Sequence, residues 1–240
     1  MLNLKKTATK LEVGELSIAN CPICKAYVSQ LYFMQDADTK ITSKWYACSC
    51  GVVFQNQLPN GEEKKQDDTF SQKIYDNYAY PVKVYSPIIE ELIYGRKVLL
   101  VNPKNTHQEQ EFESRGWVVI KTDDFEKQQF KESEKFNMIW LYMNLERFQD
   151  PIASLQLCHK LLAEDGILFI ASPDTDFIST RSSSNFIHWK PNTNHIMWNR
   201  RSIALHLESL GFNVILNRQN YEHRFSDWDT FHVVAQKKFF

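Results

Sequence analysis

Glycine is scarce in this chain, which has only 7 glycines among its 240 residues. Average usage is about 7%, so the count is less than half of what a protein of this length ordinarily carries. Loops that hold phosphates or a nucleotide need several glycines, because these let the backbone turn sharply and approach the ligand. The low count therefore argues against a glycine-rich nucleotide-binding loop.

The sequence also lacks an excess of charge of either sign and any long apolar run. It has 28 Lys+Arg against 29 Asp+Glu, so no global attraction to nucleic acid or anionic lipid is expected. The longest apolar runs, Val98–Val101 and Ile167–Ala171, are far shorter than the roughly 20 residues that cross a bilayer. Residues 1–20 contain no apolar segment typical of a secretory signal. We therefore expect an intracellular, cytoplasmic protein that is not secreted and has no membrane partner.

An ordinary globular core is available, since hydrophobic residues make up 43% of the chain and charged residues 24%. The segment Pro59–Asp68 contains no apolar residue, which is typical of a linker. The sequence therefore predicts three parts. They are a small module at residues 1–60, a linker and aromatic-rich connector at 61–84, and a larger domain at 85–240.

Four of the five cysteines form two close pairs, Cys21 with Cys24 and Cys48 with Cys50. The segment between the pairs is rich in Tyr, Val, Leu, Phe and Trp, a composition typical of a β-hairpin. Two such pairs bring four thiolates to one point when their turns face each other, and this is the tetrahedral set that zinc prefers. In a reducing compartment the pattern indicates a metal more than disulfides. We predict one structural zinc ion with no open coordination position, and unmetallated thiols or disulfides as the alternative.

Zinc ribbons often contact nucleic acid, and this one carries Lys25, Lys40 and Lys44. However, Asp36 and Asp38 oppose these charges, and residues 1–65 contain no arginine. We therefore do not expect nucleic acid as a partner. The metal is expected to stabilise a module that is too small to fold on its own core.

From Ser86 onward, the apolar pattern alternates between strands and helices. The expected strands are Lys97–Val101, Trp117–Lys121, Asn137–Tyr142, Ile167–Ser172, Asn213–Asn217 and Phe231–Lys237. The expected helices are Ile88–Ile93 with its start at Ser86 and Pro87, Thr106–Arg115, Asp150–Ala163 and Arg200–Leu210. This alternation predicts an α/β fold with a doubly wound, mostly parallel sheet and an antiparallel pair at its end. We expect Lys97–Val101 near the centre of that sheet.

Several blocks of the larger domain follow the pattern of a known family. Residues 136–151 (FNMIWLYMNLERFQDP) resemble the fourth-strand region of class I S-adenosylmethionine-dependent methyltransferases. Leu161–Leu168 and Ser172–Asp174 resemble the next strand, and residues 195–203 and 207–214 resemble the C-terminal block. The resemblance covers about residues 85–240 and implies a methyltransferase-like sheet. A four-cysteine module before such a domain is similar to zinc-containing methyltransferases, including some that act on nucleotide sugars.

The chain departs from this family where the family binds its cofactor. The family's first strand ends in a glycine-rich motif, whereas Val98–Thr106 reads VLLVNPKNT and contains no glycine. Pro103 also removes a backbone donor. The segment Asp124–Lys135 has twelve residues, too few for the helix and third strand that the family places there. We expect a shortened sheet without that strand, and a loop Asn102–Thr106 that fills or reshapes the S-adenosylmethionine crevice.

The resemblance also implies candidate site residues. Asp123, or Asp124 next to it, matches the acidic residue that holds the ribose hydroxyls, and Asn102 stands at the start of the cofactor loop. His195 matches a family histidine near the acceptor and is a candidate general base. Glu146 ends a strand in the acceptor region. Each has a plain structural interpretation, which for Glu146 is an exposed loop carboxylate and for His195 a packing or surface role.

Two classes of function remain. In the first, the protein is a methyltransferase-fold chain with an eroded cofactor pocket, serving as a non-catalytic scaffold or interaction subunit with protein partners in a larger assembly. In the second, it is an active S-adenosylmethionine-dependent methyltransferase with a divergent pocket, acting on a small molecule such as a sugar. The missing glycines and the short 124–135 segment favour the first, with weak or no enzymatic activity. The retained acceptor-side blocks favour the second.

Overall fold

The computed structural model describes residues 18–35, 42–55, 79–103, 106–180, 188, 190, 193–220 and 229–238. In these residues the strands form one sheet of five and one sheet of six strands. The smaller sheet contains β1 (Ile18–Asn20), β2 (Tyr27–Gln35), β3 (Thr42–Ala47), β4 (Val52–Gln55) and β9 (Ile196–Trp198). The larger sheet contains β5 (Lys97–Val101), β6 (Val118–Thr122), β7 (Phe136–Tyr142), β8 (Leu162–Pro173), β10 (Phe212–Asn220) and β11 (Thr230–Lys237). The helices are α2 (Ala79–Glu90), α3 (His107–Ser114), the 3-10 turn η1 (Leu145–Arg147), α4 (Pro151–Leu161), α5 (Asp176–Thr180) and α6 (Arg200–Ser209).

The larger sheet has the strand order β10-β11-β8-β7-β5-β6. The strands β8, β7, β5 and β6 are parallel, while β11 runs antiparallel to β8 and β10 antiparallel to β11. This confirms the doubly wound, mostly parallel α/β sheet with an antiparallel pair at its end. The chain passes from β5 to β6 on one side and returns to β7 on the other. In sheets of this kind the ligand crevice lies at that reversal, outside the carboxyl ends of the strands.

The expectation that Lys97–Val101 lies near the centre is wrong, because β5 is one strand from the edge. The reason is the short segment 124–135, which contains no strand, as predicted, so no strand of the described chain lies beyond β6. This segment turns toward α4 instead. There the carboxylate of Glu126 accepts hydrogen bonds from the backbone N–H groups of Gln149 (3.1 Å) and Asp150 (3.0 Å).

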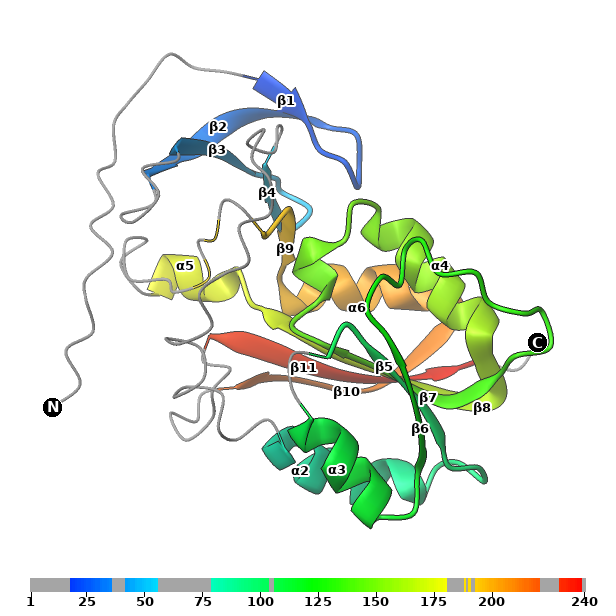
Figure 1. Cartoon of the computed structure of the whole chain (residues 1–240). Coiled ribbons are helices and arrows are strands. Elements are labelled where there is room, and N and C mark those ends of the chain that lie inside the picture. The colour runs from blue at the N-terminus through cyan, green and yellow to red at the C-terminus, as the bar shows by residue number, and fades with distance from the viewer. Residues whose placement is uncertain are drawn as a thin grey trace, which may run out of the picture.

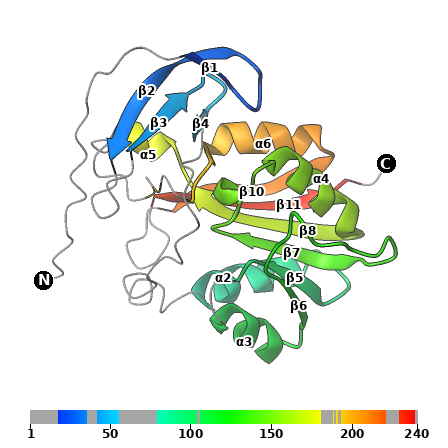
Figure 2. The ribbon, with the colours of Figure 1, turned by 45° about the horizontal axis from the view of Figure 1, so that its top comes forward.

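Helices cover both faces of the larger sheet, α2 and α3 on one face and α4 and α6 on the other (Figures 1 and 2). Side chains of β5 alternate between the two layers, because successive residues of a strand point to opposite faces. Val98 and Leu100 pack in the cluster with α2 and α3, while Leu99 and Val101 pack in the cluster with α4 and α6. All four are buried, and the burial of each side chain stabilises the folded state by about 1.5–3 kcal/mol.

The start predicted for the first helix at Ser86 and Pro87 is wrong, since α2 begins at Ala79 and Pro87 lies inside it. A proline within a helix removes a backbone hydrogen bond. Val82, Tyr85 and Ile89 recur at helical spacing and are all buried against the sheet. This apolar face stabilises the helix despite the proline.

The smaller sheet contains a strand, β9, that sequence reasoning missed. β9 pairs antiparallel with β4, in a register that places Val52 opposite Trp198 and Phe54 opposite Ile196. Cys21 and Cys48 belong to the same buried cluster as the residues under α4 and α6. Two of the paired cysteines thus share one buried core with residues of the larger sheet, and Figure 1 shows the smaller sheet beside the larger one, with β9 between β4 and the larger sheet. In the described residues, no helix is long and apolar enough to cross a membrane.

Candidate functional site

Two tight turns carry the four paired cysteines. In the first, the N–H of Cys21 donates to Ala26 O (2.8 Å) and the N–H of Lys25 donates to Cys21 O (2.9 Å). In the second, the N–H of Gly51 donates to Cys48 O (2.9 Å). Lys25 has φ 63° and Gly51 has φ 92°, so each turn closes through a left-handed residue. These turns aim both pairs of side chains at one point.

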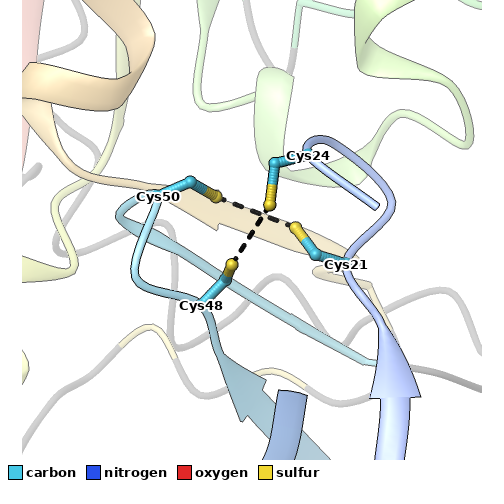
Figure 3. A group of neighbouring side chains, drawn as sticks. All are labelled: Cys21, Cys24, Cys48 and Cys50. Atoms are coloured by element: carbon cyan, nitrogen blue, oxygen red, sulfur yellow. Dashed lines mark hydrogen bonds between the residues drawn. The ribbon is translucent and has the colours of Figure 1, made fainter. Parts of the chain in front are cut away.

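The four sulfur atoms converge between the turns (Figure 3). Sγ of Cys24 lies 3.3 Å from Sγ of Cys48, and Sγ of Cys21 lies 3.7 Å from Sγ of Cys50. All four ligand atoms lie within 4.8 Å of one another. A tetrahedral ion with Zn–S bonds of about 2.3 Å needs sulfur atoms about 3.8 Å apart. The cluster therefore fits a tetrahedral metal ion, and no cysteine of the chain forms a disulfide.

The thiols of the cluster lie in unlike surroundings. A hydrogen bond from the backbone N–H of Ala26 lowers the pKa of Cys24 to about 7. Burial raises the pKa of Cys21 and of Cys50. Cysteine binds metals as the thiolate, so Cys24 is the ligand that is most readily supplied at neutral pH.

The second cysteine turn is tied to the C-terminal half of the chain at Gly51. The carbonyl of Gly51 accepts hydrogen bonds from the N–H of Asn199 (3.0 Å) and from Oγ1 of Thr175 (3.2 Å). Asn199 also caps α6, because its Oδ1 accepts from the N–H of Ser202 (2.8 Å). We call Gly51, Thr175 and Asn199 the Gly51 clamp. Sequence reasoning missed it, although an Asn before the helical pattern at Arg200 is a typical cap.

At the carboxyl ends of β5 and β6, the structure brings together the two candidate cofactor residues. Asn102 follows β5 with φ 43°, a left-handed conformation that asparagine tolerates. Its N–H donates to Thr122 O (2.7 Å). With its amide oriented to match its surroundings, Nδ2 donates to the backbone carbonyls of Thr122 (3.2 Å) and Asp123 (3.0 Å). The carboxylate of Asp123 is exposed beside this contact.

The carboxyl ends of β5 and β7 are linked by a buried asparagine. Nδ2 of Asn144 donates to Val101 O (2.7 Å) and to Tyr142 O (3.0 Å), and the side chain is 2% exposed. Asn144 therefore joins the two strands at the reversal of the sheet. Lys104 and Asn105 lie outside the described residues, so the expectation that the loop Asn102–Thr106 fills the crevice stays a prediction.

The two candidate catalytic residues are also neighbours. The N–H of His195 donates to the backbone carbonyl of Glu146 (2.6 Å). The interpretation of Glu146 as an exposed loop carboxylate is wrong, because η1 packs against β8 and β9 and leaves the residue 1% exposed. Its Oε2 accepts a hydrogen bond from Oγ of Ser172 (2.9 Å). The pair meets through the backbone of Glu146.

A second buried carboxylate lies at the end of β8. Asp174 is fully buried, and its Oδ2 accepts from Nε2 of Gln219 (2.8 Å) and lies 3.6 Å from Nε of Arg200. Burial raises the pKa of Asp174 to about 6. Sequence reasoning placed this residue in a family block without giving it a role.

A cavity of about 220 Å³ lies away from these groups, near the amino ends of β7 and β8. Its walls come from the short segment after β6 and from α4: Gln128, Phe130, Lys131, Glu132, Lys135, Leu157, Lys160 and Leu161. The space is thus separate from the crevice at the carboxyl ends of the strands.

Solved structures that are similar to this chain include three from methyltransferases or their complexes. The 1,6-didemethyltoxoflavin-N1-methyltransferase of Burkholderia thailandensis, solved with 1,6-didemethyltoxoflavin and S-adenosylhomocysteine, is similar with a TM-score of 0.51 and 11% identity over 81% of this chain and 99% of that chain. A chain from the complex of the Haloferax volcanii Trm112 methyltransferase activator with a putative methyltransferase matches with a TM-score of 0.49 and 11% identity, over 72% of this chain and 95% of that one. An S-adenosylmethionine-dependent methyltransferase of Clostridium acetobutylicum matches with a TM-score of 0.46 and 10% identity, over 72% and 96%.

The Burkholderia match, with a TM-score above 0.5 but only 11% identity, shows the fold alone. No curated protein matches the sequence. The sequence itself is matched by a family model, described as a methyltransferase domain, over residues 59–217. That match spans more than half of the 240 residues and includes β5 to β9 and most of β10. The chain belongs to the methyltransferase domain family.

Proposed function

We propose that this protein is a methyltransferase-fold interaction subunit that does not transfer methyl groups. It acts as a scaffold within a larger protein assembly and carries a structural zinc ion. The observation that carries the proposal is the conformation and bonding of Asn102 at the carboxyl end of β5.

S-adenosylmethionine needs the chain at this point to approach it through backbone alone, and glycine permits that approach. Here Asn102 adopts the left-handed conformation in place of a glycine, and its side-chain amide donates hydrogen bonds to the backbone carbonyls of Thr122 and Asp123. Pro103 then has no N–H to offer. These residues do not fit the cofactor, so we derive no methyl-transfer step from them.

The neighbouring strand end gives independent support. The amide of Asn144 is committed to Val101 O and Tyr142 O, and it holds the ends of β5 and β7 together. Both donors of its NH₂ group are used in these two bonds. A ligand entering between the strand ends would have to break contacts that are buried and satisfied.

The metal part of the proposal is that Cys21, Cys24, Cys48 and Cys50 bind one zinc ion. Four thiolates complete a tetrahedral shell and leave no position for substrate, so the ion supplies folding energy and no chemistry. The division into residues 1–60, 61–84 and 85–240 belongs to the same proposal. Protein partners are inferred for a chain whose fold is kept while its cofactor site is lost.

A second candidate function is an active methyltransferase with a divergent pocket that acts on a small molecule. Two buried carboxylates favour it. One is that of Glu146, whose backbone carbonyl accepts from the N–H of His195, and the other is that of Asp174, 3.6 Å from Nε of Arg200. Carboxylates held out of water are typical of catalytic sites. However, each carboxylate also accepts a hydrogen bond, Glu146 from Ser172 and Asp174 from Gln219, so a purely structural role explains its burial equally well.

A variant with restored glycines tests the proposal. Asn102→Gly, Lys104→Gly and Thr106→Gly are combined, and the stabilisation of this variant by S-adenosylhomocysteine in thermal unfolding is compared with that of the wild type. A ligand that binds only the folded state raises the unfolding temperature, by more when the ratio of its concentration to its dissociation constant is larger. We expect no rise for the wild type. A wild-type rise equal to or larger than that of the variant contradicts the proposal.

A further inference from the structure

We propose that β6 pairs with β6 of a second copy of this chain, which joins two six-stranded sheets into one continuous sheet. Within the described residues β6 pairs on one side only, with β5. Figure 2 shows β6 at the end of the sheet, next to β5. An edge strand presents a row of open backbone donors and acceptors to another strand.

The hydrogen bonds of β6 fix which of its backbone groups face outward. The N–H of Val118 donates to Arg96 O (2.7 Å), and Thr122 O accepts from the N–H of Asn102 (2.7 Å). Successive residues of a strand direct their N–H and C=O groups to opposite sides. Val118, Ile120 and Thr122 therefore face β5, and Val119 and Lys121 direct their backbone groups to the open edge.

Antiparallel pairing about a two-fold axis at Ile120 satisfies these groups. Val119 then lies opposite Lys121 of the second copy, and each such pair exchanges two N–H···O bonds. The axis generates the pair twice, which gives four backbone hydrogen bonds. A second copy meets this requirement because the two strands are identical and the two-fold axis makes the interface self-complementary.

The side chains on one face of β6 suit a close partner. Val118 is 60% exposed, and Ile120 is half-buried on the face that carries α4. In the proposed register, Ile120 packs directly on Ile120 of the second copy, at the close spacing of a non-hydrogen-bonded pair. On the other face, Nζ of Lys121 donates to Oε2 of Glu109 in α3 (2.8 Å). This ion pair holds the lysine over α3.

The charges at the two ends of β6 select the antiparallel orientation. The amino end carries two guanidinium groups and one carboxylate, from Arg96, Arg115 and Glu90. The carboxyl end carries two carboxylates and one ammonium group, from Asp123, Asp124 and Lys127. Antiparallel strands place the positive end of one copy against the negative end of the other, whereas parallel strands would oppose like charges.

The test measures the mass of the zinc-loaded full chain by light scattering over a wide range of concentrations. The wild type is expected to reach twice the mass of one chain. Val119→Pro removes one outward N–H and leaves the bonds to β5 intact, since proline is tolerated at an open strand edge. We expect its dimer dissociation constant to rise at least about tenfold. Its zinc content is expected to stay the same, as is its unfolding temperature at concentrations where both proteins are monomeric.

A second variant, Asp123→Lys with Asp124→Lys, changes exposed side chains only and makes both ends of β6 positive. It is expected to weaken the dimer, and added salt is expected to weaken the wild-type dimer. A wild type that stays monomeric at all concentrations overturns the proposal, as does a dimer that folded Val119→Pro leaves unchanged. If Val119→Pro does not fold, the lysine variant decides. A dimer as strong as the wild type then contradicts the proposal, and a weaker one supports it.

Discussion

The carbonyl of Gly51, one residue after the last cysteine of the metal cluster, accepts a hydrogen bond of 3.0 Å from the N–H of Asn199. Asn199 is the residue that caps α6. The second cysteine turn is therefore joined to the cap of α6 by a backbone hydrogen bond, beside the pairing of β4 with β9. We therefore expect a change in the cysteine turn to destabilise the start of α6, and a change at Asn199 to destabilise the cysteine turn.

Replacing Gly51 with alanine tests this contact. Gly51 has φ 92°, and a Cβ there would lie 2.5 Å from Oδ1 of Asn199. The left-handed conformation costs about 1–2 kcal/mol, and loss of the α6 cap adds about 1 kcal/mol. The matched control is Gly116→Ala, where φ is 79° but no atom lies within 4 Å of the new Cβ. Urea unfolding is expected to show a larger loss for Gly51→Ala, and equal losses would contradict the contact.

Removal of the metal is expected to destabilise the first turn of α6. Cys48→Ser deletes one of four ligands, so zinc content measured by elemental analysis should fall from one ion per chain to near zero. Loss of the cluster releases the turn at Gly51 and with it Asn199. Hydrogen exchange should therefore speed up at residues 199–203. It should stay slow in β7, which lies inside the larger sheet between β8 and β5. Equal protection of 199–203 with and without zinc would contradict the coupling.

Asn144→Ala is expected to destabilise the protein by about 2–3 kcal/mol, because the carbonyls of Val101 and Tyr142 lose a buried donor. The control is Asn213→Ala in β10, where the side chain is exposed and a change within about 0.5 kcal/mol is expected. Urea unfolding followed by tryptophan fluorescence measures both. Similar losses for the two variants would mean that the Asn144 amide does not hold the strand ends together.

The pH dependence of stability should report on Asp174. Its pKa is raised by burial from 3.8 to about 6, so the folded state holds this proton more tightly than the unfolded chain does. The protonated carboxyl of Asp174 adds about 3 kcal/mol to the free energy of unfolding below about pH 4. This stabilisation is lost as the pH rises through 6. Asp174→Asn cannot titrate, so its stability relative to the wild type should rise between pH 4 and 6. Acid release of zinc affects both proteins alike, and a constant difference between them would contradict the assignment.

Much of the larger sheet could be predicted from the sequence, because its strands are short apolar runs with clear ends. Lys97–Val101 was predicted with the bounds that β5 has. Gly116 and Gly211 follow the helices α3 and α6 with φ of 79° and 88°, as expected of residues that end helices. The cysteine pairs also predicted the cluster, since their spacing is a local property.

The features that were missed depend on contacts between distant segments. β9 has only three residues, and its partner β4 lies far away in the sequence, so no local period indicates it. The burial of Glu146 follows from the packing of η1 against β8 and β9. At Asn102 the sequence showed only that a glycine is missing. It did not predict the left-handed conformation there, although asparagine is among the residues that tolerate it.

The central claim is that the fold is kept while its cofactor site is lost. The most direct measurement is a calorimetric titration of the zinc-loaded wild-type chain with S-adenosylhomocysteine, with S-adenosylmethionine in parallel. We expect no binding up to millimolar ligand, because the cofactor needs accessible backbone at the ends of β5 and β7. There the chain instead carries the side chains of Asn102 and Asn144, whose amides are already hydrogen-bonded. A dissociation constant in the micromolar range with one site per chain would contradict it.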